Sequence, residues 1–479
     1  MIWKKISLNK REIMEKFNNT SDLVLYEFET NSNIKMMACY IEGFIDRELF
    51  DRDILKPLIL DLKKVKDIKR TILTSKIKEI DSMENLIEDI LSGNIAIFAE
   101  DLPLSYTIEL SKWEKRAVEE PESESVVRGP KEGFIEDIFV NKSLLRRKLR
   151  TNNLVFEDLV LGKQTRTKIS IAYLQGIVNK RVLEEVKKRL SKIDIDGVLE
   201  SGYIEQLIED KPYSIIATIE NTEKPDVAAA KILEGRVAIL CDGTPHVLTV
   251  PRLFIEGVMT SEDYYVRPYY ASFLRFLRVT ALLISVFSPG VYVALQLYHQ
   301  EMIPTVLLIS MMGAREGVPL PVALETLLMV LTLEVTKESG VRLPKAVGTT
   351  VSIVGTLVLG QAAVQAGIVS APTVIIIAIT AISEFVVPAL VQGVVLYRLI
   401  ILLLGSFLGL YGTTCGLIIY ITQIITTESF GIPFGFPLTP INKEGLKDSI
   451  VRFPIWSFIY RPKAIAKRNI RRQKPPRKG

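Results

Sequence analysis

The stretch Val279–Tyr298, VTALLISVFSPGVYVALQLY, contains 20 residues and no charged side chain. A helix of about 20 apolar residues is long enough to cross the hydrocarbon core of a bilayer. Two later stretches, Ala346–Gly367 and Ser370–Gln392, reach the same length. A soluble core would have difficulty burying several such segments, so the sequence predicts an integral membrane protein with helical spans.

Other apolar stretches affect the expected number of crossings. Pro319–Val335 is shorter, and Pro304–Gly313 is too short to cross, so we expect the latter to be re-entrant or interfacial. Gly393–Ile425 is too long for one upright helix and contains several glycines, which favours two short spans that meet near Tyr411. About four to six crossings follow, with six preferred.

The charges outside these stretches predict the orientation of the chain. The formal net charge is +5, and the segment from Arg461 to Gly479 is basic without an acidic residue. Met1–Phe17 is polar and lacks the apolar core of a secretory signal. By the positive-inside rule, both termini are expected on the cytoplasmic side, which requires an even number of crossings.

The region before the apolar stretches contains one pattern twice. In the first copy two strand-like stretches lead into Tyr40–Gly43, and in the second copy two more lead into Tyr173–Gly176. A helical stretch follows in each, near Arg47–Lys56, where Pro57 is expected to end it, and over Val182–Leu190. The strand-like stretches are Leu23–Phe28, Ile34–Tyr40, Leu154–Leu159 and Lys168–Leu174.

A second shared pattern lies further along each copy. Ile90–Pro103 resembles Ile232–Pro245, and in each a helix is expected to end at a glycine, Gly93 or Gly235, which tolerates the positive φ of a C-cap. A short apolar strand follows. The duplication predicts two similar α/β subdomains; a chance similarity of two generic α/β stretches is the alternative.

These patterns predict an α/β soluble N-terminal region with two similar subdomains, followed by an α-helical polytopic transmembrane bundle. We name the parts by their expected bounds. They are subdomain 1 (1–118), the linker (119–135), subdomain 2 (136–265), the helical domain (266–427) and the C-terminal segment (428–479), which is expected to be a basic cytoplasmic tail.

The linker is acidic and contains proline and serine, which predicts an exposed loop. A helix is expected from about Glu136 to Arg150, with basic residues dense enough near its end to form a basic face. That face is either solvated or in contact with anionic lipid headgroups or a neighbouring subunit's acidic loop. The candidate linker and interface residues are Glu122, Glu124, Arg128, Arg146 and Arg147.

The sequence gives no support for catalysis. It contains no GxxxxGK[ST], GxSxG or HExxH motif. With only two histidines, His246 and His299, a catalytic triad or a multi-histidine metal site is poorly supported, and Asp101 and Asp242 are expected to close turns. The basic tail lacks interleaved aromatic residues, so nucleic acid is not an expected partner. We expect no enzyme, cofactor or metal.

Ionisable residues within apolar stretches are costly and usually face a bundle interior or water. Glu325 and Glu384 are the candidates for a water-facing or ion-facing position in conduction or conformational coupling. Glu334 lies on the face of its helix opposite to Glu325 and is expected near the interface. Arg398 is expected to extend to the cytoplasmic interface. The alternative is that the prolines and charges of this region mark ordinary helix ends and kinks.

Three stretches carry a family resemblance: Glu122–Phe134, Pro225–Ile239 and Arg267–Arg275. They resemble signature stretches of the A subunit of GerA-type spore germinant receptors of endospore-forming bacteria. The resemblance covers most of the chain, from the duplicated region to the last span, and is less diagnostic after about Arg461.

The resemblance implies a subunit of a nutrient receptor in the spore inner membrane. Its implied partners are a transporter-like B subunit, which looks like the ligand-binding partner, a lipoprotein C subunit, further copies of itself and membrane lipid. A channel-like role in ion and dipicolinate release is also implied. The related stage V sporulation AF-type protein shares these motifs and stays an alternative. A self-sufficient transporter is another, although repetition is visible only in the soluble part.

Overall fold

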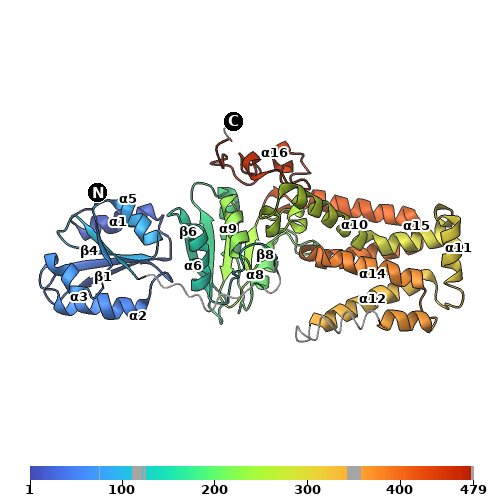
Figure 1. Cartoon of the computed structure of the whole chain (residues 1–479), viewed down its shortest axis with the longest axis horizontal. Coiled ribbons are helices and arrows are strands. Elements are labelled where there is room, and N and C mark those ends of the chain that lie inside the picture. Colours follow the sequence, from blue (N-terminus) through green and yellow to red (C-terminus); the bar gives the residue numbers. More distant parts are fainter. Residues whose placement is uncertain (75, 111–120, 122–123, 125, 342–357, 476–479) are drawn as a thin grey trace.

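The computed structural model describes residues 1–475 except 75, 111–120, 122–123, 125 and 342–357 (Figure 1). The molecule is elongated, with one α/β unit at its end, a second α/β unit in the middle and the long helices at the opposite end (Figure 1). These three units follow one another in the order of the sequence. The charged α/β region and the apolar helices are therefore separate in space as well as along the chain.

Subdomain 1 is a five-stranded antiparallel sheet with helices on both faces and strand order β1-β2-β4-β5-β3. Strand β2 is buried after Lys35 because its successive side chains serve two cores, Met37 and Cys39 on one face and Met36 and Ala38 on the other. The elements are α1 (Ile6–Lys16), β1 (Leu23–Glu29), β2 (Lys35–Ile41), α2 (Arg47–Leu49), α3 (Lys56–Asp61), α4 (Ile68–Thr71), β3 (Ile77–Ile80), α5 (Met83–Leu91), β4 (Asn94–Ala99) and β5 (Ser105–Glu109).

Subdomain 2 repeats this architecture with strand order β6-β7-β9-β10-β8, again antiparallel. Helices α6 and α9 pack on one face, and α7 and α8 pack on the other. The matching strand orders confirm the predicted duplication. The elements are α6 (Ile138–Lys148), β6 (Leu154–Leu161), β7 (Thr167–Leu174), α7 (Lys180–Leu190), α8 (Ser201–Ile208), β8 (Glu220–Thr222), α9 (Pro225–Leu233), β9 (Val237–Cys241) and β10 (Val247–Val250).

The glycines of the shared patterns occupy equivalent backbone positions in the two subdomains. Gly93 and Gly235 follow α5 and α9 with φ of 93° and 97°, as predicted for C-caps. Pro57 does not end its helix as expected. A π-helical stretch, Phe50–Leu55, precedes α3, and the wider turn removes the clash between a proline ring and the carbonyl one α-turn earlier.

Within its described residues, the helical domain has two stretches long and apolar enough to cross a membrane, Pro268–Tyr298 and Pro388–Thr426. Short helix α11 lies across the far end of the bundle (Figure 1), consistent with the interfacial alternative of the prediction. The helices of the helical domain include α10 (Pro268–Tyr298), α11 (Thr305–Gly313), α12 (Val322–Val341), α14 (Ala371–Phe385) and α15 (Val391–Thr426). Most of the predicted span Ala346–Gly367 lies outside the described residues.

The predicted span Ser370–Gln392 is wrong. Helix α14 ends at Phe385 and a 3-10 turn, Pro388–Leu390, precedes α15, because Pro388 has no N–H for an α-helical bond to Glu384. At 15 residues, α14 is about 22 Å long, shorter than a hydrocarbon core of about 30 Å.

Helix α15 is a hairpin of two helices. Gly409 adopts φ 62° and ψ −145°, a conformation that only glycine reaches readily, and there the chain reverses. The two halves then run side by side, because the Tyr397 and Tyr420 rings lie 4.8 Å apart and Gly416 faces Ile401. This agrees with the prediction of two helices that meet near Tyr411.

The C-terminal segment, predicted as a basic tail, folds back onto subdomain 2. Ile465 and Ala466 are buried, and the Ile465 carbonyl accepts a hydrogen bond from Asn179 Nδ2 at 2.9 Å. Arg461, counted among the tail charges, donates to the Leu233 carbonyl at 2.8 Å. The elements are β11 (Glu428–Ser429), β12 (Ile432–Pro433) and α16 (Lys443–Leu446). Backbone carbonyls far away in sequence satisfy these side chains, which no local pattern reveals.

Candidate functional site

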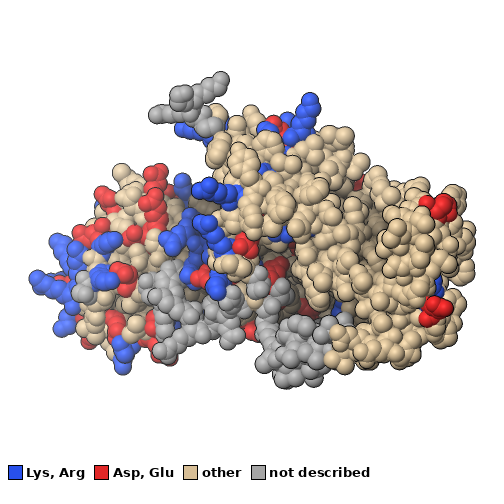
Figure 2. Space-filling model, turned by 45° about the vertical axis from the view of Figure 1, so that its right-hand side comes forward, with Lys and Arg blue, Asp and Glu red and all other residues tan. Residues whose placement is uncertain are grey.

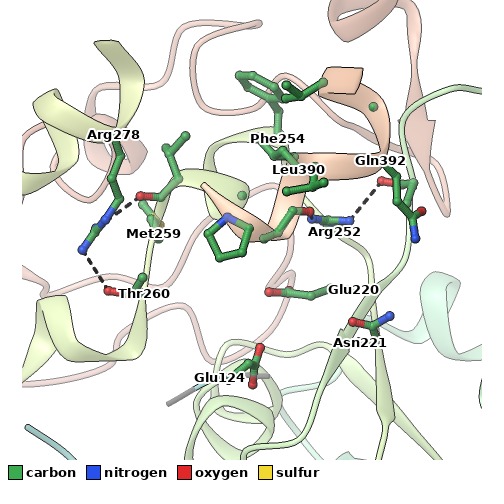
Figure 3. Close-up of a pocket in the computed structure, with 18 of the residues that line it drawn as sticks. Glu124, Glu220, Asn221, Arg252, Phe254, Met259, Thr260, Arg278, Leu390 and Gln392 are labelled. Carbon is green, nitrogen blue, oxygen red and sulfur yellow. Dashed lines mark hydrogen bonds between the residues drawn. The ribbon is translucent and has the colours of Figure 1, made fainter. Parts of the chain in front are cut away.

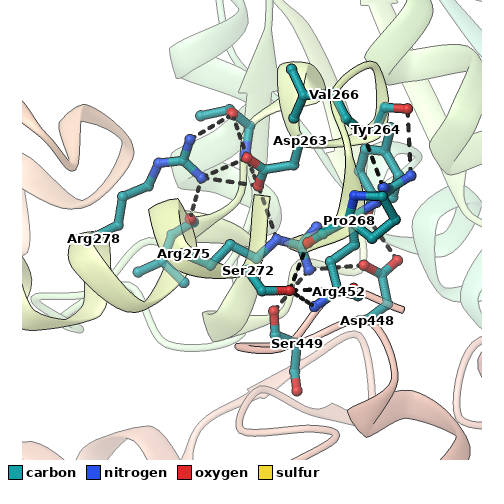
Figure 4. Close-up of polar contacts among 12 residues, drawn as sticks. Asp263, Tyr264, Val266, Pro268, Ser272, Arg275, Arg278, Asp448, Ser449 and Arg452 are labelled. Atoms are coloured by element: carbon teal, nitrogen blue, oxygen red, sulfur yellow. Dashed lines mark hydrogen bonds and ion pairs between the residues drawn. The ribbon is translucent and has the colours of Figure 1, made fainter. Parts of the chain in front are cut away.

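The base of α10 is held by buried ion pairs, which we call the base cluster: Asp263, Arg275, Arg278 and Asp448 (Figure 4). Arg275 Nε lies 2.9 Å from Asp263 Oδ2, and Arg278 Nη1 lies 2.9 Å from both Asp263 oxygens. Asp263 and Arg275 are fully buried. The Asp263 carboxylate of subdomain 2 therefore binds two arginines on successive turns of α10. These charge-assisted bonds join subdomain 2 rigidly to α10.

The C-terminal segment completes this cluster. Asp448 Oδ1 accepts from Arg275 at 2.9 Å, and Asp448 Oδ2 accepts from the Tyr264 hydroxyl at 2.8 Å. Burial, together with Asp448, raises the pKa of Tyr264 well above its ordinary value, so the phenol stays protonated and donates. Arg452 donates to the Val266 and Tyr264 carbonyls (Figure 4). Subdomain 2, α10 and the C-terminal segment thus meet at one point, which we call the junction.

A pocket of about 460 Å³ opens beside the base cluster, between subdomain 2 and the link from α14 to α15 (Figure 3). Its walls come from β8, from the stretch 252–262 and from residues 386–394. We call it the junction pocket. Its charged lining residues are Glu124, Glu205, Glu220, Lys224, Arg252, Glu262 and Arg278. A polar pocket whose two sides belong to different parts of the chain is suited to binding or to transmitting relative movement.

Arg252 links the two sides of the junction pocket. Its Nη2 donates to the Ala389 carbonyl at 2.9 Å (Figure 3), and its Nη1 lies 3.3 Å from the Ile219 carbonyl. Its Nε has no hydrogen-bond partner among the described residues, and burial lowers the pKa of the guanidinium. Movement of the α14–α15 link would break the bond to Ala389 and leave this buried cation with one acceptor fewer.

The protonation of Glu205 should make stability depend on pH. Burial and the neighbouring Glu209 raise its pKa to about 7. Because this folded value exceeds the ordinary value of 4.5, the folded chain binds more protons between the two, and its stability falls as pH rises through that window. Partial exposure screens the charge, so the loss should be about 1–2 kcal/mol.

The matching variant is Glu205→Gln, measured by thermal unfolding of the full chain in detergent at pH 5 and pH 8. Glu205→Gln should be more stable than the unsubstituted chain at pH 8, and the two should converge at pH 5. An equal difference at both pH values would contradict the assignment.

A second group of charges lies inside the helical domain, and we call it the central ion cluster: Glu334, Lys337, Glu384 and Arg398. Arg398 is fully buried and lies 3.0 Å from Glu334 and 2.5 Å from Glu384, and its Nε donates to the Ser285 carbonyl at 2.7 Å. The expectation that Arg398 extends to the interface is wrong, because two carboxylates on other helices neutralise it within the bundle.

Glu325 and Glu384 do not form one site. Glu384 is in the last turn of α14, whereas Glu325, on α12, contacts Ser370 just before the first turn of α14. Glu325 is fully buried and accepts from the Ser370 amide and hydroxyl, with Arg315 Nε 3.8 Å away. Ser370 and Glu384 are 14 residues apart, about 21 Å along a helix. Both carboxylates are buried and bonded to protein groups. Their role in ion movement or coupling stays a prediction.

The candidate linker residues divide into distinct environments. Glu122 lies outside the described residues, and Arg128 is exposed. Glu124 was predicted to be exposed, but it is partly buried. Its carboxylate accepts a hydrogen bond from the Thr222 hydroxyl on β8 at 2.6 Å, and burial raises its pKa. The linker end is therefore docked on subdomain 2.

The prediction of a basic face on the helix before Arg150 is wrong for Arg146. Arg146 is fully buried and forms two bonds with Asp22, at 2.8 and 3.0 Å, across the contact between the subdomains. Arg147 and Lys148 pair with Glu132 at 3.0 and 2.9 Å. Two carboxylates, Asp22 and Glu132, therefore pair with three of these cations.

Sequence reasoning missed Asp263, Arg252 and Asp448, the residues that organise the junction. An indirect signal existed for Asp263 and Asp448. Their partner Arg275 lies in Arg267–Arg275, one of the stretches that carried the family resemblance. Among the residues that the structure describes, no cluster of three or more His, Cys, Asp or Glu residues could hold a metal ion.

A family model described as Bacillus/Clostridium GerA spore germination protein matches residues 11–464. The chain belongs to this family. Spore germination protein KA of Bacillus subtilis (strain 168) is 39% identical, over 99% of this chain and 89% of that protein. Spore germination protein B1 of the same organism is 35% identical, over 95% and 96%. The crystal structure of the N-terminal domain of the A subunit of the Bacillus megaterium spore germinant receptor GerK3 is 33% identical over 53% of this chain and 97% of that one, with a TM-score of 0.41.

In this GerA-family chain, the three stretches that carried the resemblance meet around the junction. Glu124 of the first lines the junction pocket, and Arg275 of the third belongs to the base cluster. Lys231 and Arg236 of the second both pair with Glu256, next to the pocket wall. Although burial alone would raise it, these two cations lower the pKa of Glu256 to about 2. Stretches far apart in sequence thus build one site.

Proposed function

We propose that this chain is a membrane subunit of a nutrient germinant receptor that triggers spore germination. It acts as an oligomeric, channel-like, signal-transducing component in the spore inner membrane. Family membership and the spore germination proteins among its relatives support the biological role. Its proposed partners are the transporter-like B subunit and the lipoprotein C subunit, and the proposal assigns it no enzymatic activity.

The observation that carries the signal-transducing part is the junction. Asp263, Arg275 and Asp448 join three parts of the chain through buried ion pairs, and Arg252 bonds to the backbone of the α14–α15 link. A displacement of the soluble region would be passed directly to α10 and to the link before α15. Buried polar contacts favour discrete arrangements over gradual deformation, which suits a switch.

The central ion cluster supplies the element that such a displacement would rearrange. It is neutral as a whole, with two carboxylates and two cations, and its members come from three helices, α12, α14 and α15. Relative movement of these helices would separate charges in an apolar environment and draw in water or ions. This supports the coupling role proposed for Glu384, and Glu325 at the other end of α14 is the matching candidate.

Deletion of the gene tests the proposal. Spores that lack the chain should lose germination in response to the receptor's nutrient and should regain it with the intact gene. Glu384→Gln should change nutrient-triggered ion release, measured by loss of spore potassium. Normal germination with lost solute uptake would instead favour a self-sufficient transporter. Slower germination with every nutrient would favour the accessory role of the AF-type relative.

A further inference from the structure

The C-terminal segment exposes a group of large apolar side chains. Ile441 is 79% exposed and Trp456 is 61% exposed. Four more apolar residues between them or just beyond are also exposed: Val451, Phe453, Ile455 and Tyr460. A folded soluble surface seldom shows so many large apolar groups within 20 residues, so this surface is expected to be covered by something.

Strong positive charge lies beside this apolar surface. From Ser449 to Gly479 the chain contains ten lysines and arginines and no aspartate or glutamate. The exposed cations among the described residues are Lys463, Lys467, Arg468, Arg471, Arg472 and Lys474. Aromatic and aliphatic side chains next to lysine and arginine are typical of protein surfaces that lie on anionic membranes.

The position of the segment matches a bilayer surface. The Arg452 amide donates to Ser272 Oγ at 3.0 Å, and Asp448 pairs with Arg275 at 2.9 Å, so the segment is fixed to the first turns of α10. These turns themselves expose Tyr269, Tyr270, Phe273 and Phe276, a pattern typical of a membrane–water interface. The segment lies beside the end of the bundle that adjoins subdomain 2 (Figure 1). Uncharged residues dominate the surface of the bundle (Figure 2).

We infer that the C-terminal segment lies on the bilayer surface, with Trp456 and its apolar neighbours among the lipid headgroups and the six exposed cations from Lys463 to Lys474 on anionic lipid. Lipid fits better than a second copy of this chain, because a second copy would bring like charges together at the same segment. The inference goes beyond the proposed function, since it needs only the membrane location of the helices. Lipid contact at this segment would hold the junction at a fixed height relative to the bilayer.

Tryptophan fluorescence can test this contact in the full-length chain, reconstituted in vesicles of phosphatidylcholine and phosphatidylglycerol. The chain has three tryptophans, Trp3, Trp113 and Trp456, and the first two belong to the part before residue 119. Brominated lipid quenches only tryptophans that contact it. The comparison of the unsubstituted chain with Trp456→Phe isolates the Trp456 emission, and Trp3, which is half exposed in subdomain 1, is the internal control.

Most of the Trp456 emission should be lost in brominated vesicles, while Trp456→Phe should be quenched little. Replacing four basic residues with glutamine (Lys467, Arg468, Arg471 and Arg472) should remove the dependence of quenching on phosphatidylglycerol. Unquenched Trp456 emission at a water-exposed wavelength would overturn the inference. Unquenched emission that is blue-shifted would also overturn it and would show that protein, such as a second copy, covers the surface.

Discussion

Arg398→Ala is expected to destabilise the helical domain by about 3–5 kcal/mol and to abolish nutrient-triggered germination. Among the described residues, Lys337 is then the one cation paired with Glu334 and Glu384, so one carboxylate loses its partner inside the bundle. The Ser285 carbonyl also loses its donor. Thermal unfolding in detergent, followed by the helical circular dichroism signal, measures the loss.

The double variant Arg398→Leu/Glu384→Leu separates stability from function. It removes one charge of each sign and leaves the neutral pair of Glu334 and Lys337, so stability should recover to within about 1–2 kcal/mol. Germination should stay lost if the cluster is the coupling element. Arg70→Ala, at an exposed arginine of subdomain 1, is the control and should change neither property. An Arg398→Ala chain as stable as the unsubstituted one would refute the structural role of the cluster.

Arg146→Ala is expected to destabilise the soluble region by a similar amount, about 3–5 kcal/mol. Arg146 forms a bidentate pair with Asp22, and both side chains are at most 2% exposed. Its removal leaves Asp22 buried, with the Thr20 hydroxyl, 2.5 Å away, as the one remaining side-chain donor among the described residues. The contact between the subdomains should loosen, so protease should cleave between them at lower concentrations.

Lys148→Ala is the matched control on the same helix. Lys148 is partly exposed, and its partner Glu132 keeps the bond to Arg147, so the cost should be no more than about 1 kcal/mol. Arg146→Lys should fall between the two, since a lysine keeps the charge but cannot form both bonds. Equal effects of Arg146→Ala and Lys148→Ala would mean that burial of the pair contributes nothing.

The broad organisation could be predicted because it depends on local composition and periodicity. Uncharged stretches such as Val279–Tyr298 must be helical to satisfy their backbone in a membrane. Gly93 and Gly235 end helices in equivalent places because a C-cap needs a positive φ wherever it occurs. The reversal within Gly393–Ile425 was visible for the same reason, since glycine is the residue that allows the conformation of Gly409.

The candidate site was predicted poorly because its chemistry depends on partners far away in sequence. Arg146 and Asp22 are 124 residues apart, and Arg275 and Asp448 are 173 apart. A basic run on one helix looks solvated until a distant carboxylate is placed against it. Arg398 near a helix start was expected at the interface for the same reason, although its partner Glu334 lies 64 residues earlier.

The sequence by itself determined that a duplicated, charged α/β region precedes apolar helices, because hydrophobic periodicity and glycine positions are local properties of the chain. The tertiary structure alone decided which charges are neutralised and where the C-terminal segment lies. Electrostatic pairing depends on distance in space, and only the folded chain brings Asp263, Arg275 and Asp448 together at the base of α10.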